Sequence, residues 1–323
     1  MNFTPIDGKG LVDGYCLIKS IDIKTSSKGD TYLDLTLADS EGEINAKLWN
    51  YNAALGSYEA NSVVKVRGTI LQYNGQDQLR VEKIRLTNEH DNIRMEDFVK
   101  SANYSAEKMY DELFDLAKGF KDAQLSSLVT AILEENRMAL LYWPAAFKLH
   151  HAVRGGLLMH TLSIVRLAQV VCKIYPFVDE ELLLSGAILH DIAKTREFTV
   201  ADTGIATGYS LKGNLVGHLA EGAIMVRETA KRLNIPEETS NLIEHMLLSH
   251  HGEPEFGAAM RPLFLEAELL SELDLMDARI YEVKEALLNT KEGEFSQKMW
   301  AMENRKFYNH NRVDLNRDAD IIK

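Results

Sequence analysis

The alternation of hydrophobic and polar residues divides the chain into two halves with different periods. In residues 15–86 apolar side chains recur at every second position, which is the period of a strand with one buried face. In Thr31–Ala38, for example, Leu33, Leu35 and Leu37 alternate with polar or aromatic residues. Five strands are predicted: Tyr15–Lys24, Thr31–Ala38, Glu43–Trp49, Val63–Tyr73 and Gln78–Leu86.

The connections between these strands indicate a small closed barrel. Asn74-Gly75 lies between the fourth and fifth strands, and this pair favours a tight hairpin turn whose central residues need positive φ. A longer connection, residues 50–61, separates the third strand from the fourth. Five short strands with a longer insertion at that place are typical of an all-β oligonucleotide/oligosaccharide-binding (OB) barrel.

After Asn92 the apolar residues recur every three or four positions, which predicts helices. Pro236 and Pro262 stand where a first-turn proline is tolerated, and Gly252 follows His251 as a helix stop would. Seven helices are predicted: Ala106–Ala117, Ala123–Asn136, Leu157–Ile174, Glu180–Ala193, His218–Leu233, Pro236–His250 and Pro262–Leu288. The fold class is therefore a multidomain one, an all-β barrel followed by an all-α helical bundle. The predicted boundaries are 1–90 for the barrel, 91–104 for a linker, 105–302 for the helical domain and 303–323 for a charged, frayed tail.

Composition fits this division. A chain of 323 residues suggests about two domains, and 46% hydrophobic with 26% charged residues is ordinary for a soluble globular protein. Two cysteines are too few for a disulfide framework, and residues 1–10 lack the pattern of a signal peptide. The longest uninterrupted apolar stretches fall short of the ~20 residues that a membrane span needs. We therefore expect a cytoplasmic protein with no membrane partner.

Charge is distributed unevenly. The net charge of −12 argues against a protein that coats nucleic acid by bulk electrostatics. Residues 1–90, however, hold 10 Lys and Arg against 12 Asp and Glu, so the helical half carries most of the acidity. Candidates for base stacking on the barrel are Tyr32, Trp49 and Tyr73, although aromatic residues in short strands also serve as core, and Trp49 could instead close one barrel end. Candidates for phosphate contact are Lys47, Lys65, Arg67, Arg80, Lys83 and Arg85.

Histidine and aspartate residues recur through the helical half as a series. Its members are His160, His190-Asp191, His218, His250-His251 and Asp274. They lie near helix ends or within apolar helices, where unpaired charge is costly. A single buried histidine is usually a hydrogen-bonded core residue, but the whole series is explained most simply by a metal ion. Imidazole and carboxylate donors without a thiolate suit Mn, Fe, Co, Ni or Zn.

The motifs around these residues resemble the HD-domain superfamily of metal-dependent phosphohydrolases over roughly residues 145–290. Its landmarks here are Gly155–Thr161, His190–Lys194 and Ser249–Gly252. With an OB-type barrel in front, residues from about 12 to 300 resemble the YhaM family of bacterial 3′→5′ exoribonucleases. The resemblance implies a metal-dependent exoribonuclease that acts on single-stranded RNA, and on single-stranded DNA as a further substrate.

The same resemblance implies roles for individual residues. His160, His190, Asp191 and Asp274 match the positions that hold a first ion. His218, His250 and His251 match those that allow a second, with Asp191 between the two and manganese the favoured metal. Asp277 is a poorer ligand choice than Asp274. Lys194 follows His190-Asp191 by one helical turn and is expected to hold a phosphate oxygen, unless it is a solvated lysine at a helix end.

The ligand set indicates the chemistry. A metal ion lowers the pKa of bound water from about 15.7 toward about 7, so a hydroxide nucleophile is available at neutral pH. The catalytic candidates are Asp191, Lys194 and His218. Either His218 or His251 could act as acid toward the leaving 3′-oxygen, although a metal-bound histidine is a poor proton donor. His150 and His151 are candidates for contact with the terminal nucleotide or with the metal ligands, and Arg154 is a candidate for holding a phosphate; otherwise all three are ordinary polar loop residues.

Two other functions remain open. An HD-type hydrolase of small or cyclic nucleotides would leave the barrel without a use, and its cyclic-dinucleotide form expects Gly-Tyr-Pro where this chain has Gly252-Glu253-Pro254. A nucleic-acid-binding accessory factor with a structural HD site predicts loss of ligands, whereas all seven are present. A homo-oligomer is also expected, of a symmetry that no residue decides.

Overall fold

The structure, a computed structural model, describes residues 3, 5–6, 10–39, 42–52, 57–73, 75–91, 93–99, 101–147 and 152–322. Contacts between residues divide the chain into two units, each of which is described here by itself. The first is Met1–Ser101 with Val200–Ile205, and the second is Ala102–Thr199 with Ala206–Lys323.

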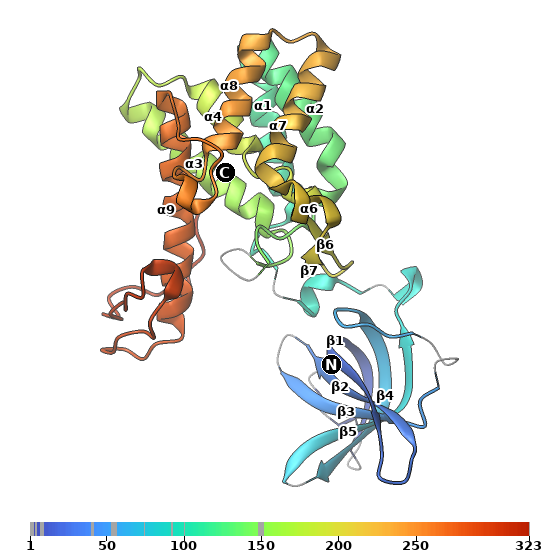
Figure 1. The fold of residues 1–323 in the computed structure, drawn as a ribbon. Helices are drawn as coiled ribbons and strands as arrows, with labels where there is room; N and C mark the ends of the chain where they lie inside the picture. Colours follow the sequence, from blue (N-terminus) through green and yellow to red (C-terminus); the bar gives the residue numbers. More distant parts are fainter. Residues whose placement is uncertain are drawn as a thin grey trace. The chain divides into compact units, whose positions relative to one another are not determined.

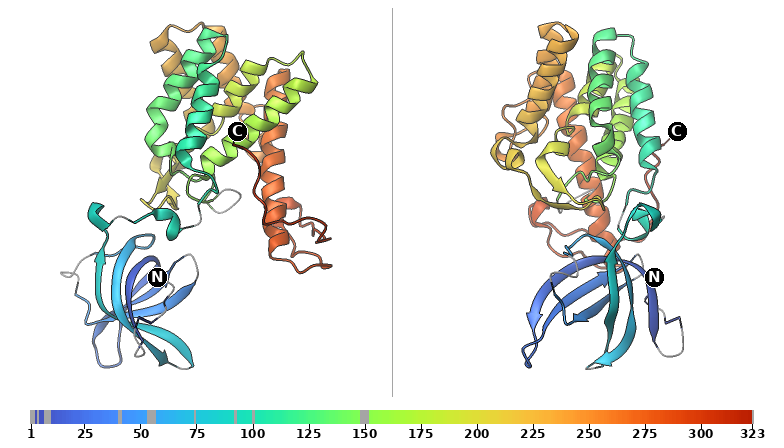
Figure 2. Two further views of the ribbon diagram at one scale, coloured as in Figure 1. Left: turned by 180° about the vertical axis from the view of Figure 1, so that it is seen from behind. Right: turned by 90° about the vertical axis from the view of Figure 1, so that its right-hand side faces the viewer.

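The first unit is a closed five-stranded barrel (Figures 1 and 2). Its strands are β1 (Leu11–Thr25), β2 (Thr31–Ala38), β3 (Glu43–Trp49), β4 (Val63–Tyr73) and β5 (Gln76–Leu86). They follow one another around the barrel in the order β1-β2-β3-β5-β4. The β3–β5 pair is parallel, with Asn45 opposite Gln78, and the other pairs are antiparallel. This topology confirms the predicted OB-type barrel.

The predicted alternation forms the barrel core. Leu33, Leu35 and Leu37 on β2 are at most 1% exposed, while their polar neighbours face outward. Strand β1 begins at Leu11, four residues before the predicted start, because Leu11 pairs with Thr69 of β4. Asp13 and Gly14 interrupt the apolar pattern there, so the pairing was not visible in the sequence.

The second unit is a bundle of helices with one small hairpin (Figure 1). The helices predicted from the apolar period are α1 (Ala106–Lys118), α2 (Ala123–Leu140), α3 (Gly156–Ile174), α4 (Glu180–Leu189), α7 (Gly217–Leu233), α8 (Glu237–Ser249) and α9 (Leu265–Leu288). Elements not predicted are α5 (Lys194–Glu197), β6 (Phe198–Val200), β7 (Ala206–Tyr209) and α6 (Leu211–Leu215). Short 3₁₀ turns are Glu89–Asp91, Met95–Asp97, Pro254–Phe256 and Trp300–Met302. An all-α HD-type bundle after the barrel is thereby confirmed as the fold class.

Helix α4 ends at Leu189, although the apolar pattern predicts a helix through Ala193. The chain forms a turn after His190, where the Lys194 amide donates to the Asp191 carbonyl at 2.9 Å, and α5 begins at Lys194. The apolar residues Ile192 and Ala193 are buried in this turn rather than in a helix. The turn places the side chains of His190 and Asp191 at the end of α4.

Helix α3 is long and apolar enough to cross a membrane by length and composition, with a mean hydropathy of 1.5 over an 18-residue window. In the structure 61% of that window is buried inside the unit. Helices α1, α4 and α9 pack against it. Its apolar character is thus explained by its place as the core helix of the bundle.

The C-terminal residues after Met302 are packed onto the helical unit rather than frayed. Ile321 is 4% exposed, and its carbonyl oxygen accepts a hydrogen bond from Arg166 Nε of α3 at 2.7 Å. Lys284 of α9 donates to the Arg317 carbonyl at 2.9 Å. The prediction of a frayed end was wrong because Ile321, near the end of an otherwise charged segment, is buried against the helical unit.

Candidate active site

Five segments of the helical unit bring the seven predicted ligands together. His160 lies on α3, His190 and Asp191 follow α4, His218 lies on α7, His250 and His251 follow α8, and Asp274 lies on α9. Most of these side chains are buried, and His160, His190, Asp191 and His250 are at most 2% exposed. The structure therefore gathers residues that span more than a hundred positions, while their role as ligands stays a prediction.

The first ligand group consists of His160, His190, Asp191 and Asp274. His160 Nε2 lies 3.3 Å from His190 Nε2 and 3.1 Å from Asp274 Oδ1. Asp191 Oδ2 lies 3.3 Å from His190 Nε2. The donor atoms of these residues thus converge on one small volume inside the bundle.

The second ligand group consists of His218, His250 and His251. One ring nitrogen of each lies within 4.8 Å of those of the other two. Asp191 joins this group to the first, because its Oδ1 lies 3.5 Å from His218 Nε2 and 3.7 Å from His250 Nε2. The two oxygens of one carboxylate therefore face two different sets of imidazoles.

The donor atoms fit divalent metal ions. Asp191 Oδ1, His218 Nε2, His250 Nε2 and His251 Nδ1 are all buried, and none has a hydrogen-bond partner within the described chain. Buried polar atoms without partners are costly, so a set of them facing one another calls for a cation. Ligand atoms about 2.1 Å from one ion lie about 3.0–3.4 Å from each other in octahedral or tetrahedral geometry, close to the spacing in the first group.

Hydrogen bonds at the opposite ring nitrogen hold four of the five imidazoles in place. His190 Nδ1 donates to the Ala187 carbonyl at 2.8 Å, and His250 Nδ1 donates to the Leu247 carbonyl at 2.7 Å. Because the Nδ1 proton is fixed by a carbonyl acceptor, Nε2 is left with its lone pair facing the cluster. This is how proteins orient histidine toward metal ions.

Two carboxylates that were not assigned this role from the sequence do the same for His160 and His218. His160 Nδ1 donates to Asp277 Oδ2 at 2.8 Å, and His218 Nδ1 donates to Glu197 Oε1 at 3.0 Å. Asp277 follows Asp274 by three residues, so the helical period could have placed both on one face of α9. Glu197 lies on the four-residue helix α5, which is too short to show a period.

Glu197 is itself positioned by a close backbone contact. The Ser210 amide donates to the Glu197 carbonyl at 2.8 Å. A Cβ on Gly213 of α6 would lie 2.1 Å from that same carbonyl oxygen. Only glycine at position 213 lets α6 approach α5 this closely. This approach fixes the Glu197 backbone, and with it the position of the Glu197 carboxylate beside His218.

The electrostatics of the cluster differ between its two halves. Burial alone would lower the pKa of His160, but hydrogen bonds to Asp274 and Asp277 raise it to about 10. Burial, together with the neighbouring His250 and His218 charges, lowers the pKa of His251 to about 3. The first group is therefore rich in negative charge, whereas in the second group burial lowers the pKa of both His250 and His251.

Lys194 lies directly against the cluster. Its Nζ is 2.6 Å from Asp191 Oδ2, and the Trp143 indole donates to the Lys194 carbonyl at 2.7 Å. Burial would lower the pKa of Lys194, but the Asp191 carboxylate raises it. Burial would raise the pKa of Asp191, yet Lys194 and His190 hold it well below its usual range. Lys194 is a charged member of the cluster rather than a solvated residue at a helix end.

The predicted nucleotide contacts next to α3 are described only in part. His150 and His151 lie outside the described residues. Arg154 lies over the ring of Tyr142, 5.5 Å from its centroid, and its carbonyl accepts from the Ala102 amide. Contact of Arg154 with a phosphate stays a prediction.

The barrel brings two of its three predicted stacking residues together. Tyr32 and Trp49 are opposite each other on β2 and β3, with ring centroids 4.5 Å apart, and Lys47 Nζ lies 4.9 Å from the Tyr32 centroid. Trp49 is 42% exposed, so it does not close the barrel end. Tyr73 lies at the end of β4, next to the β4–β5 hairpin, and is 61% exposed. In OB folds the strand 2–3 face and this hairpin are the usual nucleic-acid-binding elements.

Comparison with known proteins defines the class. The OB-fold nucleic acid binding domain family matches residues 17–87, and the HD domain family matches residues 157–279. A solved structure of the second OB-fold domain of replication protein A from Methanococcus maripaludis covers 24% of this chain and 86% of its own, at 19% identity and a TM-score of 0.21. The two family models, together with the described fold, define the class as an OB-fold domain joined to an HD domain.

Full-length relatives narrow this class to one family. The 3′-5′ exoribonuclease YhaM of Listeria monocytogenes is 37% identical over 299 residues, which cover 92% of this chain and 95% of that one. The 3′-5′ exoribonuclease YhaM of Shouchella clausii is 36% identical over 298 residues, with 92% of each chain covered. The chain belongs to the YhaM family.

Proposed function

We propose that this protein is a metal-dependent 3′→5′ exoribonuclease that hydrolyses single-stranded RNA, and single-stranded DNA as a further substrate, with hydroxide as the nucleophile. The observation that carries the proposal is the shared carboxylate of Asp191, which links two groups of donor atoms inside an HD domain. Its curated relatives are named 3′-5′ exoribonucleases over nearly their whole length. The OB-type barrel supports a polymeric substrate.

His160, His190, Asp191 and Asp274 would hold one ion, and Asp191, His218, His250 and His251 a second, with manganese favoured. Divalent ions there would lower the pKa of water and offset the negative charge that grows on the phosphodiester. In hydrolysis the water oxygen forms a bond to phosphorus, and the bond between phosphorus and the leaving 3′-oxygen breaks. The 3′-oxygen takes up a proton.

The surrounding residues set up this reaction. Glu197 and Asp277 fix the imidazoles of His218 and His160, so their donor atoms need no reorganisation when substrate arrives. Lys194 carries a positive charge at Asp191 Oδ2, in position to bind a phosphate oxygen. The contact with Glu197 favours a ligand role for His218, and its role as the acid for the leaving oxygen stays a prediction.

The proposal is tested with single-stranded RNA labelled at its 5′ end. Protein stripped of metal is resupplied with Mn²⁺, Co²⁺, Fe²⁺, Ni²⁺ or Zn²⁺ in separate reactions. The expected result is a ladder of labelled products that shorten from the 3′ end, absent without metal and absent for Asp191→Ala. Intact RNA under every ion would refute the exoribonuclease proposal and leave small nucleotides as substrates to examine.

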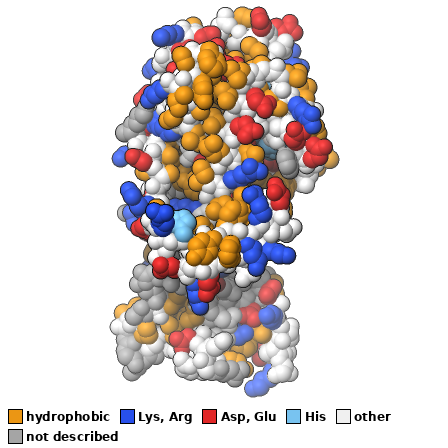
Figure 3. Space-filling view, turned by 90° about the vertical axis from the view of Figure 1, so that its left-hand side faces the viewer, with side chains coloured by type: hydrophobic (Ala, Val, Ile, Leu, Met, Phe, Trp, Pro, Cys, Tyr) orange, Lys and Arg blue, Asp and Glu red, His pale blue; other side chains and the backbone are white. Residues whose placement is uncertain are grey.

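Cytoplasmic location and homo-oligomer formation are part of the same proposal. Figure 3 shows hydrophobic side chains gathered on one face of the helical unit. On α9, Met276 and Ile280 are 47% and 53% exposed. Sedimentation of the full chain tests self-association, and a monomer at micromolar concentration would contradict it.

A further inference from the structure

A second surface of the barrel carries positive charge away from the Tyr32–Trp49 pair. The antiparallel register of β4 and β5 places Lys65 opposite Arg85 and Arg67 opposite Lys83. Lys65 and Arg67 alternate with buried Val64 and Val66, so these cations share the outer face. Like charges directly opposite each other in a sheet are destabilising. The barrel thus places two pairs of like charges next to each other, and an anionic partner would offset part of their repulsion.

Three of the four cations have no acidic partner. The Arg85 guanidinium donates to both oxygens of Asp91, at 2.6 and 2.7 Å, and the Tyr15 hydroxyl donates to Asp91 as well. Lys65, Arg67 and Lys83 form no ion pair with any residue that the structure describes. Arg85 is therefore neutralised by Asp91. Lys65 Nζ lies 5.2 Å from the centroid of the Tyr15 ring, and Lys65, Arg67 and Lys83 all keep a charge that no ion pair with a described residue neutralises.

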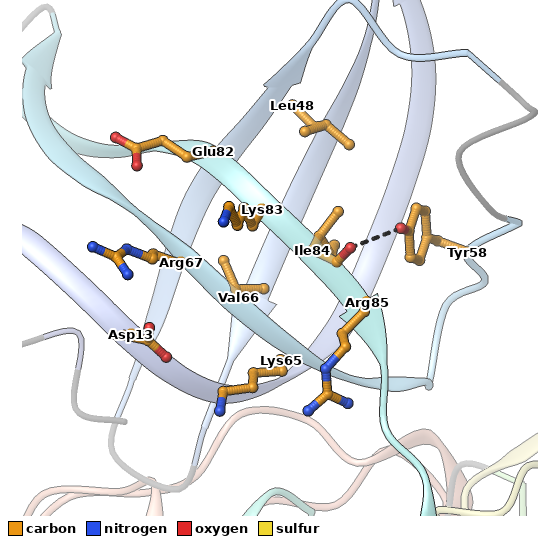
Figure 4. A pocket seen from close by; sticks show the side chains of 10 residues that line it. All are labelled: Asp13, Leu48, Tyr58, Lys65, Val66, Arg67, Glu82, Lys83, Ile84 and Arg85. Atoms are coloured by element: carbon orange, nitrogen blue, oxygen red, sulfur yellow. Dashed lines mark hydrogen bonds between the residues drawn. The ribbon is translucent and has the colours of Figure 1, made fainter.

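A cleft of about 550 Å³ lies among these cations (Figure 4). Its apolar lining is Leu48, Val66 and Ile84, together with the ring of Tyr58. The Tyr58 hydroxyl donates to the Ile84 carbonyl at 3.0 Å, which fixes the ring at the edge of the cleft. The cleft thus combines an apolar surface with a cationic one.

The acidic residues of the cleft do not cancel this charge. Asp13 is paired in register with Arg67, and Glu82 accepts a hydrogen bond from the Thr69 hydroxyl at 3.1 Å. The lining has Lys65, Arg67, Lys83 and Arg85 against these two carboxylates. A net positive surface remains within a barrel whose overall charge is slightly negative.

We propose that this cleft is a second binding site for single-stranded RNA, with phosphates on Lys65, Arg67 and Lys83 and one base against the partly exposed side chains of Leu48, Tyr58 and Ile84. The inference rests on the proposed function, since it extends the path of the same substrate. Residues two apart on a strand are ~6.6 Å apart, so Lys65 and Arg67 form a regular row suited to a repeating backbone charge. A free phosphate ion would use the cations but not the apolar lining.

This site lies beside the stacking face on different strands. Tyr32 and Trp49 lie on β2 and β3, whereas Lys65, Arg67 and Lys83 lie on β4 and β5. Strand β2 pairs with β1 and β3, and β3 pairs with β5, so the two surfaces are neighbours around the barrel. A strand of RNA bound at both places would therefore follow the barrel around its circumference.

The test uses the full chain with the triple substitution Lys65→Gln, Arg67→Gln and Lys83→Gln, named here the cleft variant. Binding of labelled single-stranded RNA is measured in EDTA at several salt concentrations. Its Kd should rise at least tenfold, and the slope of log K against log salt should become shallower by ~2, because each phosphate contact contributes ~0.7 on a single strand. Its melting temperature should not fall, since repulsion between like charges is removed.

A matched control removes three exposed charges from the helical unit by Lys118→Gln, Lys121→Gln and Lys231→Gln. The control should bind RNA within twofold of the unmodified chain. Unchanged Kd and slope in the cleft variant, or equal weakening in the control, would overturn the proposal.

Failure here is distinct from failure of the proposed function, because binding is measured without metal and without turnover. A chain that cuts no RNA, but whose cleft variant binds it weakly, refutes only the exoribonuclease activity. In an active chain the cleft variant should lose more of its rate on long RNA than on a dinucleotide. An equal loss of rate on dinucleotide and long RNA would place the defect in the active site and contradict the cleft as a binding site.

Discussion

Asp191 Oδ1 lies 3.5 Å from His218 Nε2, and within the described chain neither atom has a hydrogen-bond partner. The other oxygen of the same carboxylate lies 2.6 Å from Lys194 Nζ and 3.3 Å from His190 Nε2. One side chain therefore serves both ligand groups. A buried arrangement of this kind is unfavourable unless cations complete it, which makes Asp191 the centre of the proposed mechanism.

Removing the carboxylate behind His218 should weaken metal binding without touching a ligand. Glu197→Ala leaves the imidazole free to rotate, so the affinity for divalent ions should fall about 10–100-fold. Isothermal titration with Mn²⁺ measures the change. Glu228→Ala, an exposed glutamate on the same helix as His218, is the matched control and should bind normally. Equal affinity in both variants would show that Glu197 does not position His218.

A methyl group at position 213 should also weaken metal binding, although Gly213 does not contact His218 itself. In Gly213→Ala the new Cβ would meet the Glu197 carbonyl oxygen at 2.1 Å, and this backbone atom cannot move aside without shifting α5. Overpacking of this kind costs about 1–3 kcal/mol of unfolding free energy. Thermal unfolding and Mn²⁺ titration should both show a loss.

Gly208→Ala is the control for this change, because its Cβ would come no closer than 3.5 Å to the Thr199 hydroxyl. It should retain both stability and metal affinity. Full Mn²⁺ affinity in Gly213→Ala would mean that the α5–α6 contact does not set the position of Glu197.

Metal binding should release a proton and should strengthen as pH rises. The pKa of His160 is raised to about 10 without metal, so below that pH the metal-free chain carries a proton that the ion must displace. Affinity therefore increases with pH, and about one proton should leave at pH 7.5. Titration in buffers of different ionisation enthalpy counts it. Asp277→Asn should reduce the release, and binding independent of pH would contradict this assignment.

The stacking face should contribute to RNA affinity but not to the chemical step. Trp49→Ala removes an aromatic surface 4.5 Å from Tyr32, and loss of one stacked base costs about 1–3 kcal/mol. Fluorescence anisotropy with single-stranded RNA should show this weakening, while hydrolysis of a dinucleotide stays unchanged. Trp300→Ala, which removes a tryptophan 74% exposed on the C-terminal segment, should bind as before. The reverse pattern would exclude the β2–β3 face as a binding surface.

Much of the fold was predictable because long elements display their period. The strand alternation around Leu35 and the helical period of α3 each extend over enough residues to be recognised. The segment from Lys194 to Leu215 was not predictable in the same way, since its helices and strands have at most five residues. It carries Glu197, which is why that residue was missed.

The candidate site was predictable in its ligand types but not in its supporting contacts. His190-Asp191 and His250-His251 stand out as motifs, and the structure brings them together. The row of cations on β4 and β5 depends on which residues face each other, and a register shift between Arg67 and Gly68 sets that pairing. Sequence alone does not reveal such a shift, so Lys65 and Arg85 could be proposed as cations but not as neighbours.

The most direct test of the central claim is the number of Mn²⁺ ions bound per chain, measured by equilibrium dialysis for the unmodified protein and for Asp191→Asn. The account predicts two ions per unmodified chain and fewer than two tightly bound ions in the variant. RNA hydrolysis by the variant should fall at least about 100-fold, with RNA binding largely intact. Two tightly bound ions and full activity in Asp191→Asn would contradict the account.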